Sequence, residues 1–368
     1  MLLVLSGSVY AQNTGSISGV VRDAETDVPI PGAHVFLANT TIGDITDANG
    51  YFSIQDVQAG SYQIIARIIG FQPARKTIRI STDTLKDTPF KLTKQIYEVG
   101  AITVTDNRPS KPSRKRRRDL TRFKRMFLGT TPTRQGCEIE NPHVIEFTRL
   151  SGFFEASSNQ PIVITNKYLG YRISYLLDLF STGQNLFRFK GEPFFVELPP
   201  RDDKEAERWK KRRTETYNGS FQHFLRSAAQ GTLVKEGFDV YLTDSLYWKR
   251  PHKKLIDFFE GIEADVKPAD YIKPHTLPHE RELYFSGFLH VIYNEETMHR
   301  DFYDADLISY SASREPVRAV IRTTDGNAIF NEIGFLNNAF DIARYGYWNW
   351  ESGICNWLPF NYGLEPAG

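Results

Sequence analysis

Two residues near the middle of the chain have the types and spacing of metal ligands. His143 and Glu146 form an H-x-x-E pair, the spacing of two zinc ligands in some peptidases. They lie in a run that favours a strand, where a separation of three places two side chains on opposite faces. No motif supplies a third ligand. We therefore expect no zinc site and no catalytic residue here.

His275 and His279 are a second candidate pair, four residues apart. On a helix this spacing would place both imidazoles on one face, as a shared metal requires. Pro274 and Pro278 stand beside them, and proline interrupts a helix because it lacks the N–H donor. We therefore expect a polar loop with two exposed histidines.

A third group consists of Asp44, Asp47 and Asn49, which precede Gly50. Acidic residues before a glycine occur in calcium-binding loops, but the terminal Glu and the full loop spacing are missing. Residues 47–50 instead fit a hairpin turn, because Asn and Gly readily adopt positive φ. We expect no metal and no other cofactor.

Positive charge is concentrated in residues 105–128. This segment contains ten Lys or Arg and two Asp, a net charge of +8, whereas the whole chain has a net charge of +1. In an exported protein the anionic partners are lipid head groups, lipopolysaccharide phosphates and acidic glycans, and we expect no nucleic acid. The alternative is a solvated spacer that pairs with the acidic second half. The candidate contact residues are Arg114, Lys115, Arg116, Arg117, Arg118, Arg122, Lys124 and Arg125.

Cys137 and Cys355 are the two cysteines of the chain. In an exported protein such a pair can close a disulfide, here joining the start and the end of the second domain. Two buried free thiols are the alternative, because nothing in the sequence fixes their separation in space. Both interpretations stay open at this point.

Residues 1–11 combine a short apolar stretch with small residues. This resembles the end of a secretory signal peptide cleaved after Ala11, so we expect export to the periplasm or the outer-membrane surface. A frayed apolar N-terminus of a cytosolic protein is the alternative. No later stretch approaches ~18 apolar residues, which predicts no transmembrane helix.

Residues 16–95 alternate short apolar runs with clusters of Gly, Pro, Asn and Asp. Tyr62, Ile64 and Ala66 repeat with the period of two that is typical of a strand. The run at 29–32 contains two prolines, which break a strand because proline removes a ladder donor. The pattern predicts about seven short strands in a compact antiparallel β-sandwich.

The same segment resembles the carboxypeptidase regulatory-like domain family. The resemblance rests on Gly19-x-Val21-x-Asp23, Pro31-Gly32-Ala33-x-Val35, Thr46-Asp47-x-x-Gly50-x-Phe52 and Gly60-x-Tyr62, which occur in that order. The family has a transthyretin-like sandwich fold and occurs in Gram-negative envelope proteins. The resemblance implies a structural or interaction module without catalytic residues.

The composition of residues 105–118 predicts a linker, with two prolines and no large apolar residue. Asp119 is expected to cap a short helix that ends at Gly129. Residues 129–368 are expected to form a mixed, β-rich domain, similar to an uncharacterised domain that follows the regulatory-like module in envelope proteins. We expect strands in 143–148, 161–165, 186–189, 194–197, 239–243, 283–293 and 318–322, and helices in 202–213 and after Ser220.

Aromatic residues cluster near the C-terminus. They could stack on sugars, but their alternation also fits a closing strand with one apolar face, and we expect core packing. The residues are Tyr345, Tyr347, Trp348, Trp350 and Trp357.

These patterns together predict a mainly β protein: an N-terminal transthyretin-like or Ig-like sandwich, a basic linker and a larger β-rich α+β domain. We expect a non-catalytic, exported cell-envelope protein with an accessory or binding role. Its expected partners are an envelope protein, a glycan or an anionic lipid surface. A carbohydrate-binding protein is the second interpretation, and a hydrolase in the second domain is the third.

Overall fold

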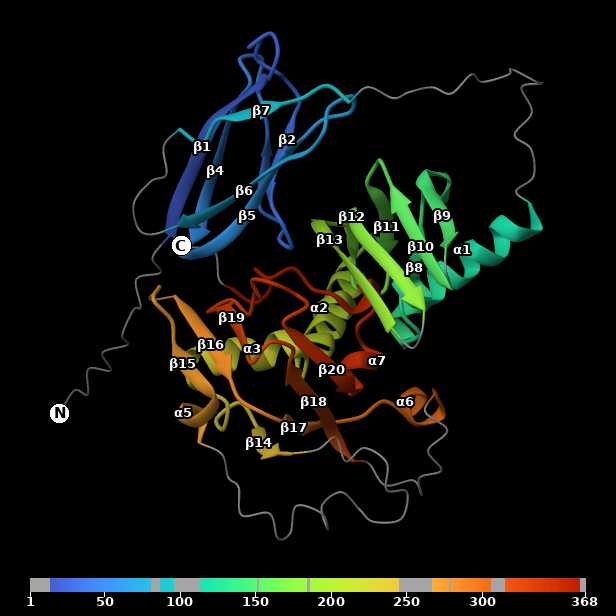
Figure 1. Ribbon diagram of the computed structural model, residues 1–368, viewed down its shortest axis with the longest axis vertical. Coiled ribbons are helices and arrows are strands. Elements are labelled where there is room, and N and C mark those ends of the chain that lie inside the picture. The colour runs from blue at the N-terminus through green and yellow to red at the C-terminus, as the bar shows by residue number, and fades with distance from the viewer. Residues whose placement is uncertain are drawn as a thin grey trace, which may run out of the picture. The chain divides into compact units, whose positions relative to one another are not determined.

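The computed structural model describes residues 14–80, 87–95, 113–150, 152–183, 186–244, 267–277, 279–305 and 315–364. It divides into two compact units, one of residues 1–103 with 363–368 and the other of residues 104–362 (Figure 1). Strands dominate both units, which confirms the mainly β fold. The predicted signal segment 1–11 and residues 105–112 of the predicted linker lie outside the described residues. Within the described ranges, no helix is long and apolar enough to span a bilayer.

Unit 1 is a β-sandwich, and its described residues contain the seven strands that the sequence predicts. Along β1 every second residue is buried, among them Ile17 and Val21, because successive side chains of a strand point to opposite faces. One sheet has the order β4 (Tyr51–Gln58), β1 (Thr14–Asp23), β7 (Phe90–Leu92), and the other β3 (Gly43–Ile45), β2 (His34–Leu37), β5 (Gly60–Arg67), β6 (Ala74–Ile80).

The prediction of a wholly antiparallel sandwich is wrong at β7. This strand pairs with β1 in parallel, with Val21 opposite Phe90 and Asp23 opposite Leu92. The preceding strand, β6, belongs to the other sheet, so the chain crosses the sandwich before β7, and a crossover is what a parallel neighbour requires. The crossover places Phe90 and Leu92 in the core.

Residues 47–50 form a tight turn as predicted, but the prediction of a hairpin is wrong, because the flanking strands β3 and β4 belong to different sheets. The Gly50 N–H donates to the Asp47 carbonyl at 3.0 Å, and Asp47 Oδ1 accepts from the N–H groups of Asn49 and Tyr51 at 2.8 Å. Gly50 has a φ of 71°, and a Cβ there would lie 2.6 Å from the Val21 carbonyl oxygen. The Asp47 carboxylate therefore stabilises the turn through these hydrogen bonds.

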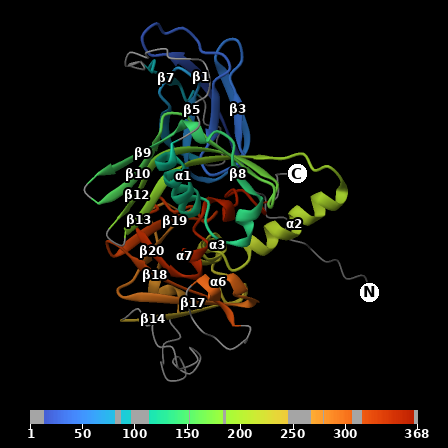
Figure 2. The ribbon, with the colours of Figure 1, turned by 90° about the vertical axis from the view of Figure 1, so that its right-hand side faces the viewer.

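The first sheet of unit 2 is built around its longest strand, β12. Helix α1 (Arg114–Phe127) covers one face of this sheet and lies in front of it in Figure 2. The strand order is β8 (Cys137–Ile139), β11 (Ile162–Asn166), β12 (Tyr171–Gly183), β10 (Phe153–Ser158), β9 (Ile145–Leu150), and β13 (Leu186–Glu197) pairs with β12.

A second core lies beneath helix α3 (Phe221–Gln230), whose Phe224, Leu225 and Ala228 are buried against Trp348 and two smaller sheets. These sheets have the orders β14 (Phe238–Thr243), β17 (Phe288–Thr297), β18 (Pro316–Thr323), β20 (Ile342–Gly346), and β15 (Ile272–Pro274), β16 (Glu280–Tyr284), β19 (Asn327–Asn331). The remaining helices among the described residues are α2 (Asp203–Tyr217), α5 (Pro268–Tyr271), α6 (Arg300–Ala305) and α7 (Tyr347–Trp350), with short 3-10 helices η1 (Pro132–Gly136), η2 (Pro142–Val144) and η3 (Ile354–Asn356).

Both helices predicted in the second half are present, and the one predicted at 202–213 spans Asp203–Tyr217. Asp202 accepts from the Glu205 N–H at the start of α2, and Ser220 Oγ accepts from the His223 N–H at the start of α3. Gly231 ends α3 in the left-handed region, with a φ of 70°.

The predicted strands 143–148, 161–165, 239–243 and 318–322 fall on β9, β11, β14 and β18. Two details differ. The predicted strands 186–189 and 194–197 are parts of one strand, β13. The predicted strand 283–293 is divided into β16 and β17 by a turn at Gly287, which has a φ of 92°.

Candidate functional site: a basic helix on a disulfide-tied core

Helix α1 begins five residues before the predicted N-cap. Ser113 is the cap, and its Oγ accepts from the Arg116 N–H at 3.1 Å. The prediction of Asp119 as N-cap is wrong, because Asp119 lies within the helix, buried, with its carboxylate bound to Arg149. The run 114–118, predicted as part of a linker, is therefore helical.

The apolar side of α1 fixes its orientation. Phe123 and Phe127 are fully buried and stack at 4.9 Å between ring centroids, as residues four apart on a helix can. Phe127 also meets Tyr175 of β12 edge-on at 5.0 Å, and Phe123 contacts Phe180 at 4.7 Å. These rings bury one side of α1 in the sheet, so the opposite side faces solvent.

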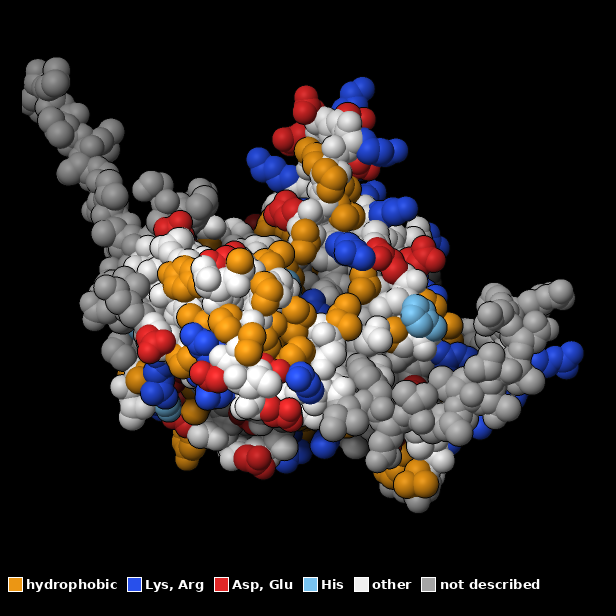
Figure 3. All heavy atoms as spheres, turned by 90° about the horizontal axis from the view of Figure 1, so that it is seen from above, with side chains coloured by type: hydrophobic (Ala, Val, Ile, Leu, Met, Phe, Trp, Pro, Cys, Tyr) orange, Lys and Arg blue, Asp and Glu red, His pale blue; other side chains and the backbone are white. Residues whose placement is uncertain are grey.

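The solvent side of α1 is almost entirely cationic. Six of the predicted contact residues are exposed and a seventh, Lys124, is half-buried. Within the described part of the chain, none of these seven side chains forms an ion pair with a carboxylate. In Figure 3 blue side chains appear at the right-hand edge, the side that α1 occupies in Figure 1. We call these seven residues the basic face: Arg114, Lys115, Arg117, Arg118, Arg122, Lys124 and Arg125.

Arg116, the eighth predicted contact residue, forms hydrogen bonds within unit 2. Its Nη2 donates to the carbonyls of Pro142 and Ile145, each at 3.1 Å, and its guanidinium lies 5.8 Å from the ring centroid of Phe147. These bonds hold the start of α1 against the segment that leads into β9. Arg116 is therefore not part of the basic face.

A further cation that the charge pattern does not indicate, Arg149 of β9, extends the basic face. Arg149 lies opposite Phe154 in the β9–β10 register, and its Cζ lies 5.5 Å from the Phe154 ring centroid. Arg122 approaches the same ring from α1, with its Cζ at 4.6 Å. The signal for this arrangement is a cross-strand register, which local sequence patterns do not provide.

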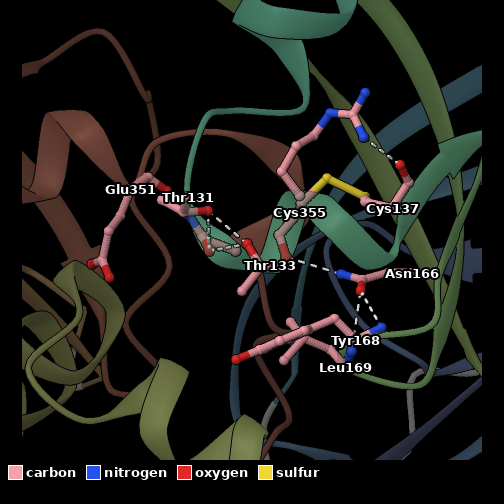
Figure 4. The surroundings of a disulfide bond; sticks show 10 residues. Thr131, Thr133, Cys137, Asn166, Tyr168, Leu169, Glu351 and Cys355 are labelled. Carbon is pink, nitrogen blue, oxygen red and sulfur yellow. Dashed lines mark hydrogen bonds between the residues drawn. A yellow bond between two sulfur atoms is a disulfide. The ribbon is translucent and has the colours of Figure 1, made fainter. Parts of the chain in front are cut away.

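Cys137 of β8 and Cys355 of η3 form a disulfide whose Cα atoms lie 6.2 Å apart (Figure 4). Both cysteines are buried in the same core as the apolar side of α1. Asn166 supports the bond, because its Nδ2 donates to the Cys355 carbonyl at 2.9 Å while its Oδ1 accepts from the N–H groups of Tyr168 and Leu169. The disulfide thus anchors the C-terminal segment to the sheet under α1.

A polar cluster beside the disulfide holds the same segment. The hydroxyls of Thr131 and Thr133 contact each other at 2.7 Å and both donate to Asn356 Oδ1, and Asn356 Nδ2 donates to the Glu351 carbonyl at 3.1 Å. Figure 4 shows the Glu351 side chain pointing away from the sulfur atoms. Each buried polar group of this cluster has a partner, as a stable buried network requires.

The second core of unit 2 binds the far end of the C-terminal segment, residues 351–362. Arg226 of α3, only 6% exposed, donates from Nη1 to the Tyr362 carbonyl at 3.0 Å and from Nη2 to the Phe360 carbonyl at 2.9 Å. Residues 351–362 are therefore bonded to both cores of unit 2.

The histidine pairs do not form metal sites in the described residues, where no group of three or more His, Cys, Asp or Glu could hold an ion. His143 lies in η2 and Glu146 in β9. The expectation that His275 and His279 are both exposed is wrong. Their side chains are 24% and 34% exposed, and each Nδ1 pairs with a different carboxylate: Glu280 at 3.0 Å and Glu332 at 3.6 Å.

One carboxyl group with an unusual pKa lies near the end of α7. Burial raises the pKa of Glu351 to about 8, and the negative charge of Glu296 raises it further, while a hydrogen bond with Tyr347 opposes the shift. Burial also raises the pKa of Glu296, whose Oε1 accepts from Asn218 Nδ2 at 3.1 Å. Glu351 thus retains a proton at neutral pH, at a site that links α7 to the C-terminal segment.

The prediction of a closing strand for the C-terminal aromatics is wrong. Tyr345 lies in strand β20, but residues 347–350 form helix α7. Core packing holds for Trp348, which is 2% exposed and donates from Nε1 to the Gly219 carbonyl at 2.7 Å. Trp357 stacks on Phe189 at 5.7 Å and donates to the Ser352 carbonyl. These rings are engaged in packing.

Comparison with known proteins gives a family for unit 1 only. Residues 17–104 match the CarboxypepD_reg-like domain. No curated protein matches the chain. The proposed resemblance of residues 129–368 to an uncharacterised envelope domain stays a prediction.

Several solved structures are similar to parts of the chain. A cohesin–X-dockerin complex of Acetivibrio cellulolyticus is 27% identical over 21% of this chain and 56% of that one, with a TM-score of 0.19. The minor pilin GBS52 of Streptococcus agalactiae is 18% identical, covering 28% and 50%, with a TM-score of 0.20. The major pilin subunit of Bacillus cereus is 13% identical, covering 51% and 70%, with a TM-score of 0.19. The matched region spans about half the length of the first of these structures. Residues 17–104 of this mainly β chain form a CarboxypepD_reg-like domain.

Proposed function

We propose that this protein is a non-catalytic, exported accessory protein of the cell envelope that binds anionic surfaces through the basic face of α1. The observation that carries the proposal is the basic face itself, seven cations on the solvent side of a helix whose other side is buried. The regulatory-like domain, an interaction module by family, supports a binding role.

The helix makes these charges more effective than a linker would. Fourteen residues of α-helix extend about 21 Å, and burial of Phe123 and Phe127 keeps the cations on one side over that length. Each Lys or Arg beside an anionic membrane contributes roughly 1 kcal/mol, a contribution that salt screens within a Debye length of about 10 Å. Seven cations thus provide a strong attraction that depends on salt.

The proposed exported location is supported by the buried disulfide. Bonds of this kind form and persist in oxidising compartments such as the periplasm, and are rare in the cytosol. Peptide mapping without reductant, on protein recovered from a periplasmic fraction, should recover Cys137 linked to Cys355. Recovery of both as free thiols from that fraction would argue against the assignment.

Vesicle flotation tests the binding role. The purified chain is mixed with vesicles of a zwitterionic lipid, with and without an anionic lipid, at low and at high salt. We expect flotation with the anionic vesicles at low salt, its loss at high salt, and none with the zwitterionic vesicles. Equal flotation with both vesicle types, or none with either, would refute the proposal.

A further inference from the structure

The basic face contains a stripe of arginines. Arg114, Arg118, Arg122 and Arg125 follow one another at spacings of four, four and three, so they project from one side of α1. Arginine differs from lysine in offering a planar fork of donors that matches the oxygens of a phosphate. The stripe can therefore recognise a phosphate by the arrangement of its donors as well as by its charge.

One arginine of this stripe, Arg122, rests on an aromatic ring. The guanidinium carbons of Arg122 and Arg149 lie 4.6 and 5.5 Å from the centroid of the same ring, Phe154. Arg122 comes from α1 and Arg149 from β9, and both guanidinium groups lie against this one ring. Stacking on a ring orients a guanidinium plane and restricts its rotamers.

The ring is itself rigid. Phe154 is 2% exposed, stacks on Phe147 with 5.6 Å between centroids and a 17° angle between planes, and meets Phe180 edge-on at 6.1 Å. Arg149 is held further by its bond to the buried carboxylate of Asp119. The two guanidinium groups are thus positioned before any ligand arrives.

Both arginines keep N–H donors that are available to a ligand. Arg149 uses Nη2 for Asp119, whereas Arg122 has no carboxylate or carbonyl partner among the described residues. Both side chains reach solvent. Two oriented forks with open donors suit a ligand that offers several oxygens and more than one negative charge.

We infer that Arg122 and Arg149, together with the arginine stripe, recognise the phosphomonoester head group of a lipid surface in preference to other anions of equal charge. A phosphomonoester has three terminal oxygens and a charge of about −1.5 to −2 at neutral pH. A phosphodiester offers two free oxygens and one charge, so it cannot engage two forks equally well. This inference rests on the proposed function and names the ligand of the same face.

The test compares vesicles of matched surface charge that carry phosphatidic acid, phosphatidylglycerol or a fatty acid as the anionic component. We expect the wild-type chain to bind the phosphatidic acid vesicles about five-fold or more tightly than the other two, because bidentate arginine contacts add to the charge term. In the variant Arg118→Lys with Arg122→Lys this preference should disappear, while salt-sensitive binding to all three vesicles remains.

A matched control is Arg188→Lys. Arg188 is an exposed arginine of β13 whose Cζ lies 5.6 Å from the ring centroid of Phe340, away from the basic face. It should keep the wild-type preference. Circular dichroism of each variant checks that the fold is intact, and lysine retains the charge and most of the packing at these exposed positions.

The outcomes separate the two proposals. Equal binding to all three vesicles, or a preference that survives in the double variant, overturns this inference and leaves the binding role in place. Absence of binding to every vesicle overturns both. Displacement from phosphatidic acid vesicles by inorganic phosphate, but not by sulfate at the same ionic strength, would identify free phosphate as the ligand and overturn the lipid assignment.

Discussion

Cys137 and Cys355 are separated by 218 residues in sequence, yet a disulfide joins them in the core beneath α1. The bond ties β8 to the C-terminal segment, whose far end is held by Arg226 of the other core. The basic face is therefore carried by a sheet that is cross-linked to the end of its own unit.

Replacement of both cysteines by serine should reduce the stability of unit 2. A cross-link that closes a loop of this length removes loop entropy from the unfolded chain, which the chain-entropy model values at about 5 kcal/mol. Urea unfolding of the Cys137→Ser, Cys355→Ser variant measures the loss. An unchanged midpoint would show that the bond does not constrain this unit.

Gly353→Ala should also destabilise the C-terminal segment. A Cβ on Gly353 would lie 2.4 Å from Gly129 Cα and 2.5 Å from the Leu128 carbonyl oxygen, and these are backbone atoms that cannot rotate away. We expect a loss of roughly 1–3 kcal/mol in the free energy of unfolding. Ser352→Ala, one residue earlier, is the control, and a similar loss in both variants would contradict the steric explanation.

Glu351 should make stability fall as pH rises. Its pKa is raised from the ordinary 4.5 to about 8 in the folded protein, so between these values the folded state holds a proton that the unfolded chain has released. The free energy of unfolding therefore declines from about pH 4.5 to about pH 8, by an amount on the order of 5 kcal/mol, and then levels off.

Melting temperatures of Glu351→Gln at pH 5, 7 and 9 test this linkage. The neutral amide should match the wild type near pH 5 and exceed it at pH 9. The control Glu332→Gln changes a carboxylate that is 42% exposed and pairs with His279, and it should keep the wild-type decline. A Glu351→Gln curve parallel to the wild type would exclude Glu351 as the cause.

Asp119→Asn should strengthen binding to anionic vesicles while weakening the fold. The change leaves Arg149 without its carboxylate partner, which adds one net positive charge beside the basic face. We expect roughly five-fold tighter binding, since one charge near an anionic membrane contributes about 1 kcal/mol. Vesicle titration and urea unfolding measure the two effects, and weaker or unchanged binding would argue that the ligand approaches elsewhere.

The helices of unit 2 show what the sequence can and cannot predict. Helix α3 follows Ser220 as predicted, because a capping hydroxyl is a local signal, and Gly231 ends the helix in the left-handed region. For α1 two capping residues compete, Ser113 and Asp119, and the cationic run between them disfavours an isolated helix through repulsion. Burial of the phenylalanines on the sheet, a tertiary effect, extends the helix back to Ser113.

The basic residues of the candidate site could be predicted, but their arrangement could not. The charge run identifies seven of the residues, whereas Arg149 joins them only through the register of β9 with β10. The same limit applies to the C-terminal aromatics, where a short apolar run fits either a strand or a helix by period alone. The disulfide depended on a distance that no local pattern encodes.

The most direct test of the central claim is the affinity for anionic vesicles at low salt after removal of three charges from the basic face. Arg117→Gln, Arg118→Gln and Arg125→Gln are compared with Lys204→Gln, Lys210→Gln and Lys211→Gln, which remove the same charge from exposed positions of α2. We predict that the α1 variant binds roughly 100-fold more weakly than the wild type and that the α2 variant changes little. Equal weakening in both variants would show that net charge, and not the basic face of α1, determines binding.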